Sequence, residues 1–371
     1  MLTRNLTAKR PQLYTSYDSE TALLNTRAKR NTVIVLLLVG AALPLLLNDA
    51  DTMMIARGSA YAVGAIGLGL LTGYAGQISL GHAFFAGVGF YAAAVIAGDP
   101  DGRSLGFGFS EVLIWLPAAG LVAAAVGVLV APLATRLRGL YLAIVTLGLV
   151  FIGEHFFRQW DDITGGLSTG RTPPIVELFG YRLDVDGTFT RAEQLYWLLL
   201  VLMIIFAVGA RNIARSNIGR AFTAIRDRDI AAGVIGVNLV KQKTIAFAIS
   251  SFYAGCAGAL FYVTLLNVNP SQFNLFLSIL FIVIVLIGGA GTISGAIAGA
   301  YLIAVLPRLT TELAGVLPFI STKPQEVPND SHMQFVLYGL LIIGFLIFEP
   351  RGLFGIWVRL RNWWKSFPFS Y

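Results

Sequence analysis

A short glycine-rich stretch, GYAGQISLGHAFFAGVGFYAA from Gly73 to Ala93, holds a cluster of polar residues within an otherwise apolar region. Hydroxyl, amide and imidazole groups gather there on Tyr74, Gln77, Ser79 and His82. Two interpretations are open. The side chains either satisfy backbone groups that glycine frees at a break between helices, or they face a path through the protein. We expect a helix break in either case.

No other residues predict catalysis or metal binding. His82, His155 and His332 are scattered, and none has a cysteine or carboxylate at ligand spacing. Glu154 and His155 are adjacent, so they do not share a helix face, and no nucleophile accompanies them. None of the six lysines follows a glycine, which excludes the Gly-Lys pair of a P-loop. The sequence therefore predicts no enzyme, no metal and no nucleotide bound by this chain.

The composition indicates an integral membrane protein. Of 371 residues, 56% are hydrophobic and only 13% are charged, whereas about a quarter of a soluble domain is charged. A net charge of +7 would suggest nucleic acid in a soluble protein. Here the positions of the basic residues point to membrane orientation instead, so nucleic acid is not an expected partner. The single cysteine, Cys256, allows no intrachain disulfide.

Apolar runs of about 20 residues predict an all-α bundle of ten membrane helices. The predicted spans are 32–47, 52–71, 80–97, 112–134, 140–157, 194–210, 244–266, 275–289, 294–313 and 333–348. Glycine and polar residues interrupt 49–98, where we expect a broken or re-entrant segment. Eight full spans plus two re-entrant segments is the alternative topology.

Basic residues divide between the two sides of this topology as the positive-inside rule requires. With the N-terminus inside, 19 of the 27 Lys and Arg lie in cytoplasmic segments, and 15 of the 20 Asp and Glu lie outside. Both termini are therefore predicted to be cytoplasmic. The predicted organisation is a basic N-terminal segment 1–31, a transmembrane domain 32–348 and a C-terminal segment 349–371.

Two loops are longer than ordinary connectors, and long loops are often functional. The outer loop, 158–193, contains LDVDGTFT, in which Asp186 and Gly187 predict a hairpin turn. The inner loop, 211–243, predicts one or two short amphipathic helices, hinged near Gly233 or Gly236. Its predicted apolar positions are Ala221, Ile225, Ala232, Ile235 and Leu239. A helix lying on acidic lipid would show the same pattern.

Small residues at four-residue spacing predict close helix packing. Gly291, Gly295 and Gly299 stack on one face, within this protein or at a subunit interface. Arg308 and Glu312 are four residues apart and are expected to pair. No carboxylate lies near the middle of a predicted span, which argues against a proton-driven secondary transporter.

Four blocks of the chain together resemble a known family. GYAGQISLGHAFFAGVGFYAA is similar to a signature of permease subunits of branched-chain amino acid ABC importers, of the LivM type. The segment GRAFTAIRDRDIAAGVIGVNLVKQKTIAFAISSFYAGCAGALF resembles that family's coupling segment and the helix after it. IVLIGGAGTISGAIAGA and EPRGLFG also resemble it. Permeases for urea and short amides are closely similar, and they remain an alternative.

The resemblance implies a multi-pass protein of the bacterial plasma membrane that forms half of a translocation pathway. It implies a second, LivH-type permease, two cytoplasmic ATPases and an extracytoplasmic binding protein, with ATP and magnesium bound by the ATPases alone. The implied contacts with the ATPase are Gly219, Arg220, Ala231, Ala232 and Gly236. Ile230 stands where the family often has an acidic residue, and ITGGLSTGRTPP departs from the family's outer loop. A self-sufficient secondary transporter or channel is the alternative of another class.

Overall fold

The computed structural model describes residues 27–366 except 101, 103, 138, 184, 186, 266, 267 and 317–328. It falls into two compact units, Met1–Leu46 and Leu47–Tyr371, which are described separately. The first contains α2 (Arg27–Ala42) and the 3₁₀ turn η1 (Leu43–Leu46). Helix α2 thus begins five residues before the first predicted span, while the prediction for residues 1–26 lies outside the described chain.

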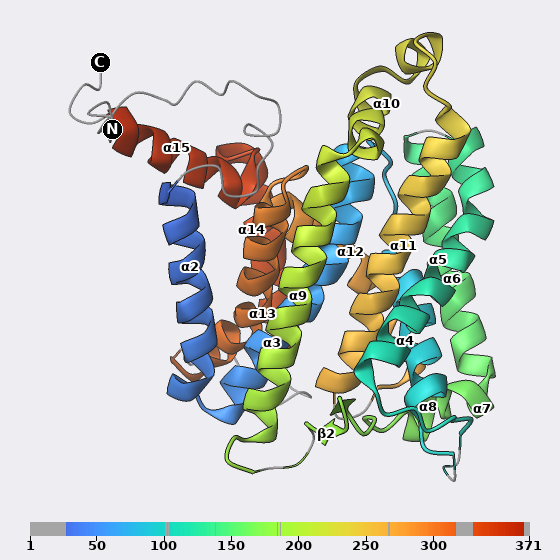
Figure 1. Cartoon of the computed structure of the whole chain (residues 1–371), viewed down its shortest axis with the longest axis vertical. Helices are drawn as coiled ribbons and strands as arrows, with labels where there is room; N and C mark the ends of the chain where they lie inside the picture. The colour runs from blue at the N-terminus through green and yellow to red at the C-terminus, as the bar shows by residue number, and fades with distance from the viewer. Residues whose placement is uncertain are drawn as a thin grey trace, which may run out of the picture. The chain divides into compact units, whose positions relative to one another are not determined.

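The second unit is a helix bundle (Figure 1). Its first half contains α3 (Asp49–Leu68), the π-helix η2 (Gly69–Tyr74), α4 (His82–Ala97), α5 (Val112–Arg136), α6 (Leu140–Gln159), and the single turns α7 (Asp161–Thr164) and α8 (Gly166–Thr169). Strands β1 (Glu177–Leu178) and β2 (Tyr181–Arg182) precede the second half. That half contains α9 (Arg191–Arg215), α10 (Asn217–Val234), α11 (Leu239–Thr264), η3 (Pro270–Gln272), α12 (Leu275–Gly288), α13 (Ile293–Val316), α14 (Asp330–Phe348) and α15 (Gly352–Ser366).

Each of the ten predicted spans lies on helical structure, and the predicted all-α membrane architecture is confirmed. By length and composition, seven helices of the described chain can cross a membrane, or eight if α14 and α15 form one bent span. The apolar segments Arg30–Leu46 and His82–Ala97 are shorter. The predicted count of ten is therefore reached only if both short segments cross the membrane in addition to the eight.

Asparagine begins several of these helices, because its side-chain oxygen can accept a bond from a free N–H of the first turn. The caps are Asn48 on Asp51, Asn238 on Lys241, Asn274 on Leu277 and Asn329 on His332. Helix α9 begins with a reciprocal capping box between Thr190 and Glu193. These local signals set where the chain turns back into the bundle.

Helix α11 is the centre of the second unit and packs against α3, α4 and α5. Glycine makes this approach possible, as expected for membrane helices. A methyl group on Gly258 would lie 1.9 Å from the carbonyl oxygen of Ala86, and one on Gly89 would lie 2.2 Å from the Cα of Gly255. No side chain fits in either place, so the α4–α11 contact is one of backbone against backbone.

The glycine stripe of α13 packs within the chain. A methyl group on Gly295 would lie 2.3 Å from the carbonyl oxygen of Gly288, and one on Gly299 would lie 2.4 Å from that of Ile284. Both face α12. Gly291 instead lies in the α12–α13 turn, with a positive φ of 80°.

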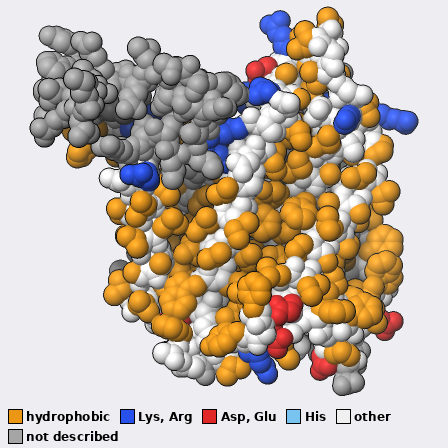
Figure 2. Space-filling model, in the orientation of Figure 1, with side chains coloured by type: hydrophobic (Ala, Val, Ile, Leu, Met, Phe, Trp, Pro, Cys, Tyr) orange, Lys and Arg blue, Asp and Glu red, His pale blue; other side chains and the backbone are white. Residues whose placement is uncertain are grey.

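The second unit has two ends, which we call the α10 end and the hairpin end after their elements (Figure 1). Hydrophobic side chains cover the middle of the face shown in Figure 2, while most Lys and Arg side chains in view gather toward the α10 end. The Asp and Glu side chains in view lie mainly toward the hairpin end. On this face an apolar belt thus separates an end rich in basic side chains from an end where acidic side chains gather.

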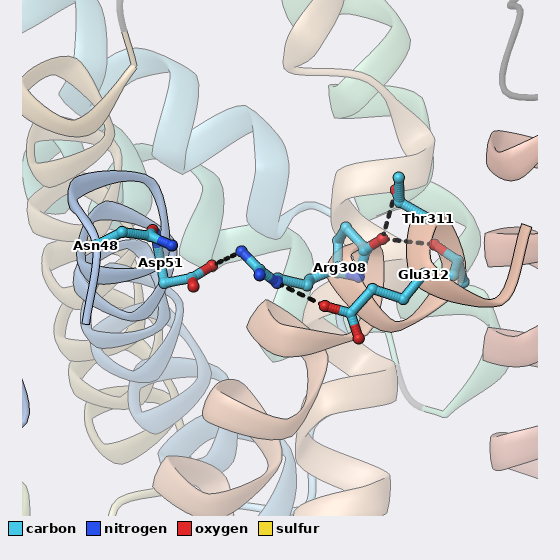
Figure 3. A network of polar contacts seen from close by, with 7 residues as sticks. Asn48, Asp51, Arg308, Thr311 and Glu312 are labelled. Carbon is cyan, nitrogen blue, oxygen red and sulfur yellow. Dashed lines mark hydrogen bonds and ion pairs between the residues drawn. The ribbon is translucent and has the colours of Figure 1, made fainter. Parts of the chain in front are cut away.

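Arg308 joins α13 to α3 at the hairpin end (Figure 3). Its Nη1 donates to Asp51, and its Nε donates to Glu312 Oε1 at 3.0 Å. The predicted Arg308–Glu312 pair is confirmed. Asp51 was not predicted as a partner, because it lies 257 residues away in the chain.

The outer loop contains a hairpin, but the described turn is at Phe179 and Gly180, where both φ values are positive. Two-residue hairpin turns of this kind need positive φ at both positions. Glu111 accepts from the N–H groups of both turn residues. The turn predicted at Asp186 and Gly187 lies partly outside the described residues, since Asp186 is among those not described.

Arg171 holds the outer loops together. Its Nε donates to Ile163 O at 2.8 Å, its Nη2 donates to Leu105 O at 2.6 Å, and its backbone pairs with Val268. Burial lowers the pKa of this guanidinium. Three loops distant in sequence therefore share one buried cation.

Candidate functional site

The break predicted around Gln77 begins with a π-helix. Helix α3 passes into η2, whose last residue is Tyr74, and residues 75–81 are not helical until α4 begins at His82. Gly76 has a φ of 67°, which favours glycine. Single π-turns inside helices occur frequently at functional sites.

Side chains from three helices satisfy the backbone at this break. Thr72 donates to Gln77 O at 3.1 Å from within η2. Thr146 of α6 accepts from Leu80 N at 2.9 Å, and Ser278 of α12 accepts from Ala83 N at 3.0 Å. The break is therefore hydrogen-bonded and mostly packed in protein, with only Gly76 and Ile78 exposed among residues 75–81.

The four polar residues predicted here have different environments. The Nε2 of His82 lies 2.8 Å from Gly64 O, and because a carbonyl only accepts, this nitrogen carries the proton. Ser79 accepts from Gly81 N at 3.2 Å, and Tyr74 is half-buried. Gln77 is buried, yet neither its amide oxygen nor its amide nitrogen has a partner among the described residues. Only Gln77 of the four keeps an entire buried polar group unsatisfied.

Helix α10 contacts the break through Arg226. Its Nη1 donates to Gly73 O at 2.9 Å, across 153 residues of sequence. A methyl group on Gly76 would lie 2.8 Å from the Cγ of Arg226, and one on Gly73 would lie 2.3 Å from the N of Gly291. The end of the π-helix is thus enclosed by α10 on one side and by the α12–α13 turn on another.

The inner loop is hinged at a different residue from the two that the sequence predicted. Helix α10 is kinked at Arg228, whose φ of −157° and ψ of 99° are not helical. Gly233 lies within the second half, and Gly236, with a φ of 93°, follows its end. The prediction of a hinge near these glycines was wrong, because extended φ and ψ values of this kind are open to any residue and leave no glycine signal.

The residues implied as ATPase contacts lie on α10 or just after it, and they divide into buried and exposed positions. Gly219 is buried, and a methyl group there would lie 2.2 Å from Ala214 O. Ala232 is also buried, whereas Arg220, Ala231 and Gly236 are exposed. The two buried residues can shape the segment but not touch a partner in this conformation.

An exposed apolar surface on the second half of α10 was not predicted. Ile230, Val234 and Ile235 are 72%, 83% and 76% exposed. Ile235 was predicted to share the apolar face of an amphipathic helix with Ala232, but Ala232 is buried whereas Ile235 is exposed directly after α10 ends. We call these three residues the α10 apolar surface.

No cluster of three His, Cys, Asp or Glu side chains able to hold a metal occurs in the described part of the chain. Glu154 pairs with Arg158 and not with His155.

A family model described as "Branched-chain amino acid transport system / permease component" matches residues 52–346. The chain belongs to this family. It is 30% identical over 338 residues to the "High-affinity branched-chain amino acid transport system permease protein LivM" of Salmonella typhimurium, covering 86% of this chain and 74% of the relative. LivM of Escherichia coli K12 matches to the same extent. LivH of the same strain is 23% identical over 306 residues, covering 80% of this chain and 92% of LivH. No solved structure matches the chain significantly.

The four sequence blocks that resemble this permease family come together at the α10 end. Gly73 touches both Arg226 and Gly291, which belong to three different blocks. The fourth block packs beside them, since a methyl group on Gly352 would lie 2.4 Å from Ile287 O and one on Gly289 would lie 2.5 Å from Arg351 O. The family signature therefore describes one contiguous region in space.

His82 and Gln77 give a test of the two interpretations of the break. Replacing His82 with Phe removes a buried hydrogen bond, so we expect the free energy of unfolding to fall by about 1–3 kcal/mol with the KM for uptake unchanged. Replacing Gln77 with Leu removes unsatisfied groups, so we expect stability to hold and uptake to change. Thermal unfolding in detergent and uptake into vesicles measure the two effects. If Gln77→Leu destabilises the protein like His82→Phe, Gln77 acts as packing alone.

Proposed function

We propose that this chain forms half of the translocation pathway of an ATP-driven importer for branched-chain amino acids. Family membership and the similarity to LivM and LivH support this proposal. The partner half would be a LivH-type permease, and an extracytoplasmic binding protein would deliver the substrate. ATP and magnesium would bind only to two separate ATPase subunits.

In this proposal the α10 end faces the cytoplasm of a bacterial cell. Basic residues accumulate in cytoplasmic segments. Arg and Lys of the α10 end include Arg136, Arg211, Arg215, Arg220, Arg226, Arg228, Lys241, Lys243 and Arg351. The same orientation puts both chain termini in the cytoplasm if all ten helical segments cross the plasma membrane.

The observation that carries the proposal is the α10 apolar surface. Its side chains extend from a kinked segment at the basic end of a membrane bundle, and they are too exposed to be core residues. Contiguous exposed apolar residues bordered by polar ones mark interaction sites. We propose that they fill a groove of the ATPase, with Ala231 and Gly236 beside them and Arg220 on the first half of α10.

Arg226 gives a route from that surface to the pathway. It lies two residues before the kink, and it bonds to the last turn of η2, next to Gln77. Movement of the docked second half of α10 would therefore act on Gly73 and the break. We propose that this alternately closes and opens the pathway, and that the unpaired amide of Gln77 faces it.

Reconstitution tests the whole proposal. The chain is co-expressed with the candidate ATPases and LivH-type permease from the same genome, purified, and placed in liposomes with the binding protein. We expect co-purification and uptake of labelled leucine or isoleucine only when ATP is present with the ATPases. Uptake by the isolated chain without ATP would show a secondary transporter or channel instead. Selective uptake of urea or short amides would contradict the substrate assignment.

A further inference from the structure

The C-terminal segment was expected to be a basic cytoplasmic extension, but most of it is the helix α15 (Gly352–Ser366). Glu349 and Pro350 end α14, and α15 then departs from the direction of α14 by 45°. Its first turn is fixed by backbone contact, because Gly352 lies against Ile287 O at the end of α12. The rest of α15 extends from that anchor.

Apolar residues of α15 recur at steps of three and four, which places them on one face of the helix. They are Leu353, Ile356, Trp357, Leu360 and Trp364. The last four are exposed, with Trp364 at 71%. We call these five residues the α15 face.

Cations border this face, and acids are absent. Arg361 is exposed and lies one helical turn from Trp357 and from Trp364. Arg359 covers the buried Glu349, to which its Nη2 donates, while three quarters of its own side chain stays exposed. The sequence from Gly352 to Ser366 contains no Asp or Glu. Every charge left exposed on this helix is positive.

We propose that α15 lies in the cytoplasmic membrane interface, with the α15 face in the acyl boundary and its arginines on anionic lipid headgroups. Tryptophan is enriched at that depth, because its ring is apolar and its N–H is polar. Arginine can bury its stem while its charged end reaches the headgroups. A helix with Trp and Leu on one face and Lys or Arg without acids beside it is typical of helices that lie in the membrane interface.

The structure suggests a direct test with the full chain. In a Cys256→Ala background, Leu360→Cys places a fluorescent label on the α15 face, and Asn362→Cys places the same label on the opposite side as a matched control. Both variants are reconstituted into phosphatidylcholine vesicles with and without an equal share of phosphatidylglycerol. Quenching by lipids with brominated acyl chains reports the depth of the label, and iodide reports exposure to water.

We expect bromolipid to quench the label at 360 and not the label at 362, more strongly in the anionic vesicles. Arg361→Gln should lower the equilibrium constant for insertion about 5-fold in anionic vesicles, which corresponds to about 1 kcal/mol per basic residue, and leave it unchanged in phosphatidylcholine. We choose Arg361 for this test because replacing Arg359 would also remove its ion pair with Glu349.

Three results would overturn the proposal. Equal quenching of both labels by iodide would show that α15 extends into water. Equal depth in the two kinds of vesicle would remove the role of anionic lipid. Protection of position 360 only after an ATPase or a second permease is added would assign the α15 face to a protein partner. None of these readouts depends on transport, so the proposal for α15 fails or stands separately from the importer function.

Discussion

Replacing both Ile230 and Val234 with Asp should detach this permease from the ATPase proposed to drive it and abolish ATP-driven uptake. The two side chains are largely exposed in the free chain, so the change should leave folding intact. At an interface, each carboxylate would replace an apolar contact and lose its own hydration. A loss of about 2 kcal/mol or more per central apolar residue weakens binding roughly 30-fold at each position. Co-purification of the ATPase and uptake into proteoliposomes measure the result.

Val185→Asp is the matched control, because Val185 is also apolar and is about half-exposed, but lies in the outer loop between α8 and α9. It introduces a single carboxylate at the other end of the molecule and should leave the ATPase bound. If Ile230→Asp with Val234→Asp still co-purifies the ATPase at wild-type levels, the α10 apolar surface is not the docking site.

Replacing Arg226 with Gln should leave the ATPase bound but uncouple ATP hydrolysis from uptake. Arg226 does not belong to the α10 apolar surface, and it contacts Gly73 O at 2.9 Å. A hydrogen bond from a charged group contributes about 1.5–3 kcal/mol, so its loss should change the coupling between α10 and the break by roughly 10- to 100-fold. The ratio of substrate taken up to ATP hydrolysed is the measurement.

Arg228→Gln is the control for this prediction. Arg228 is two residues further on, carries the same charge and is exposed at the kink. It should leave the transport ratio close to that of the wild type, since no bond from its side chain joins α10 to the break. A wild-type ratio in the Arg226 variant would contradict the proposed route, whereas loss of the ATPase from that variant would point to a docking role instead.

Local sequence was enough to predict the class of the protein and the position of its helices. Low charge content and long apolar runs indicate a membrane bundle wherever they occur, because they depend on transfer from water and not on neighbours in space. The close packing of Gly295 and Gly299 follows from spacing on a single helix. The break between α3 and α4 was also visible, since glycine and polar residues interrupt an apolar run there.

The sequence could not locate the parts of the site that depend on contacts between distant residues. Arg226 and Gly73 are 153 residues apart, and Arg308 and Asp51 are 257 apart, so neither pair has a local pattern. The kink at Arg228 has no proline or glycine to mark it. Ile230, Val234 and Ile235 follow that kink and are exposed, which the periodicity of the sequence did not reveal.

The sequence by itself thus determined a helical membrane protein, its family and the polar break at Gly73–His82. Only the tertiary structure separated His82, which is bonded to Gly64, from Gln77, which is buried without a partner among the described residues. It also decided that α10 reaches this break through Arg226. The physical reason is that composition and periodicity measure what a segment prefers, whereas hydrogen bonds and burial depend on which other segments pack against it.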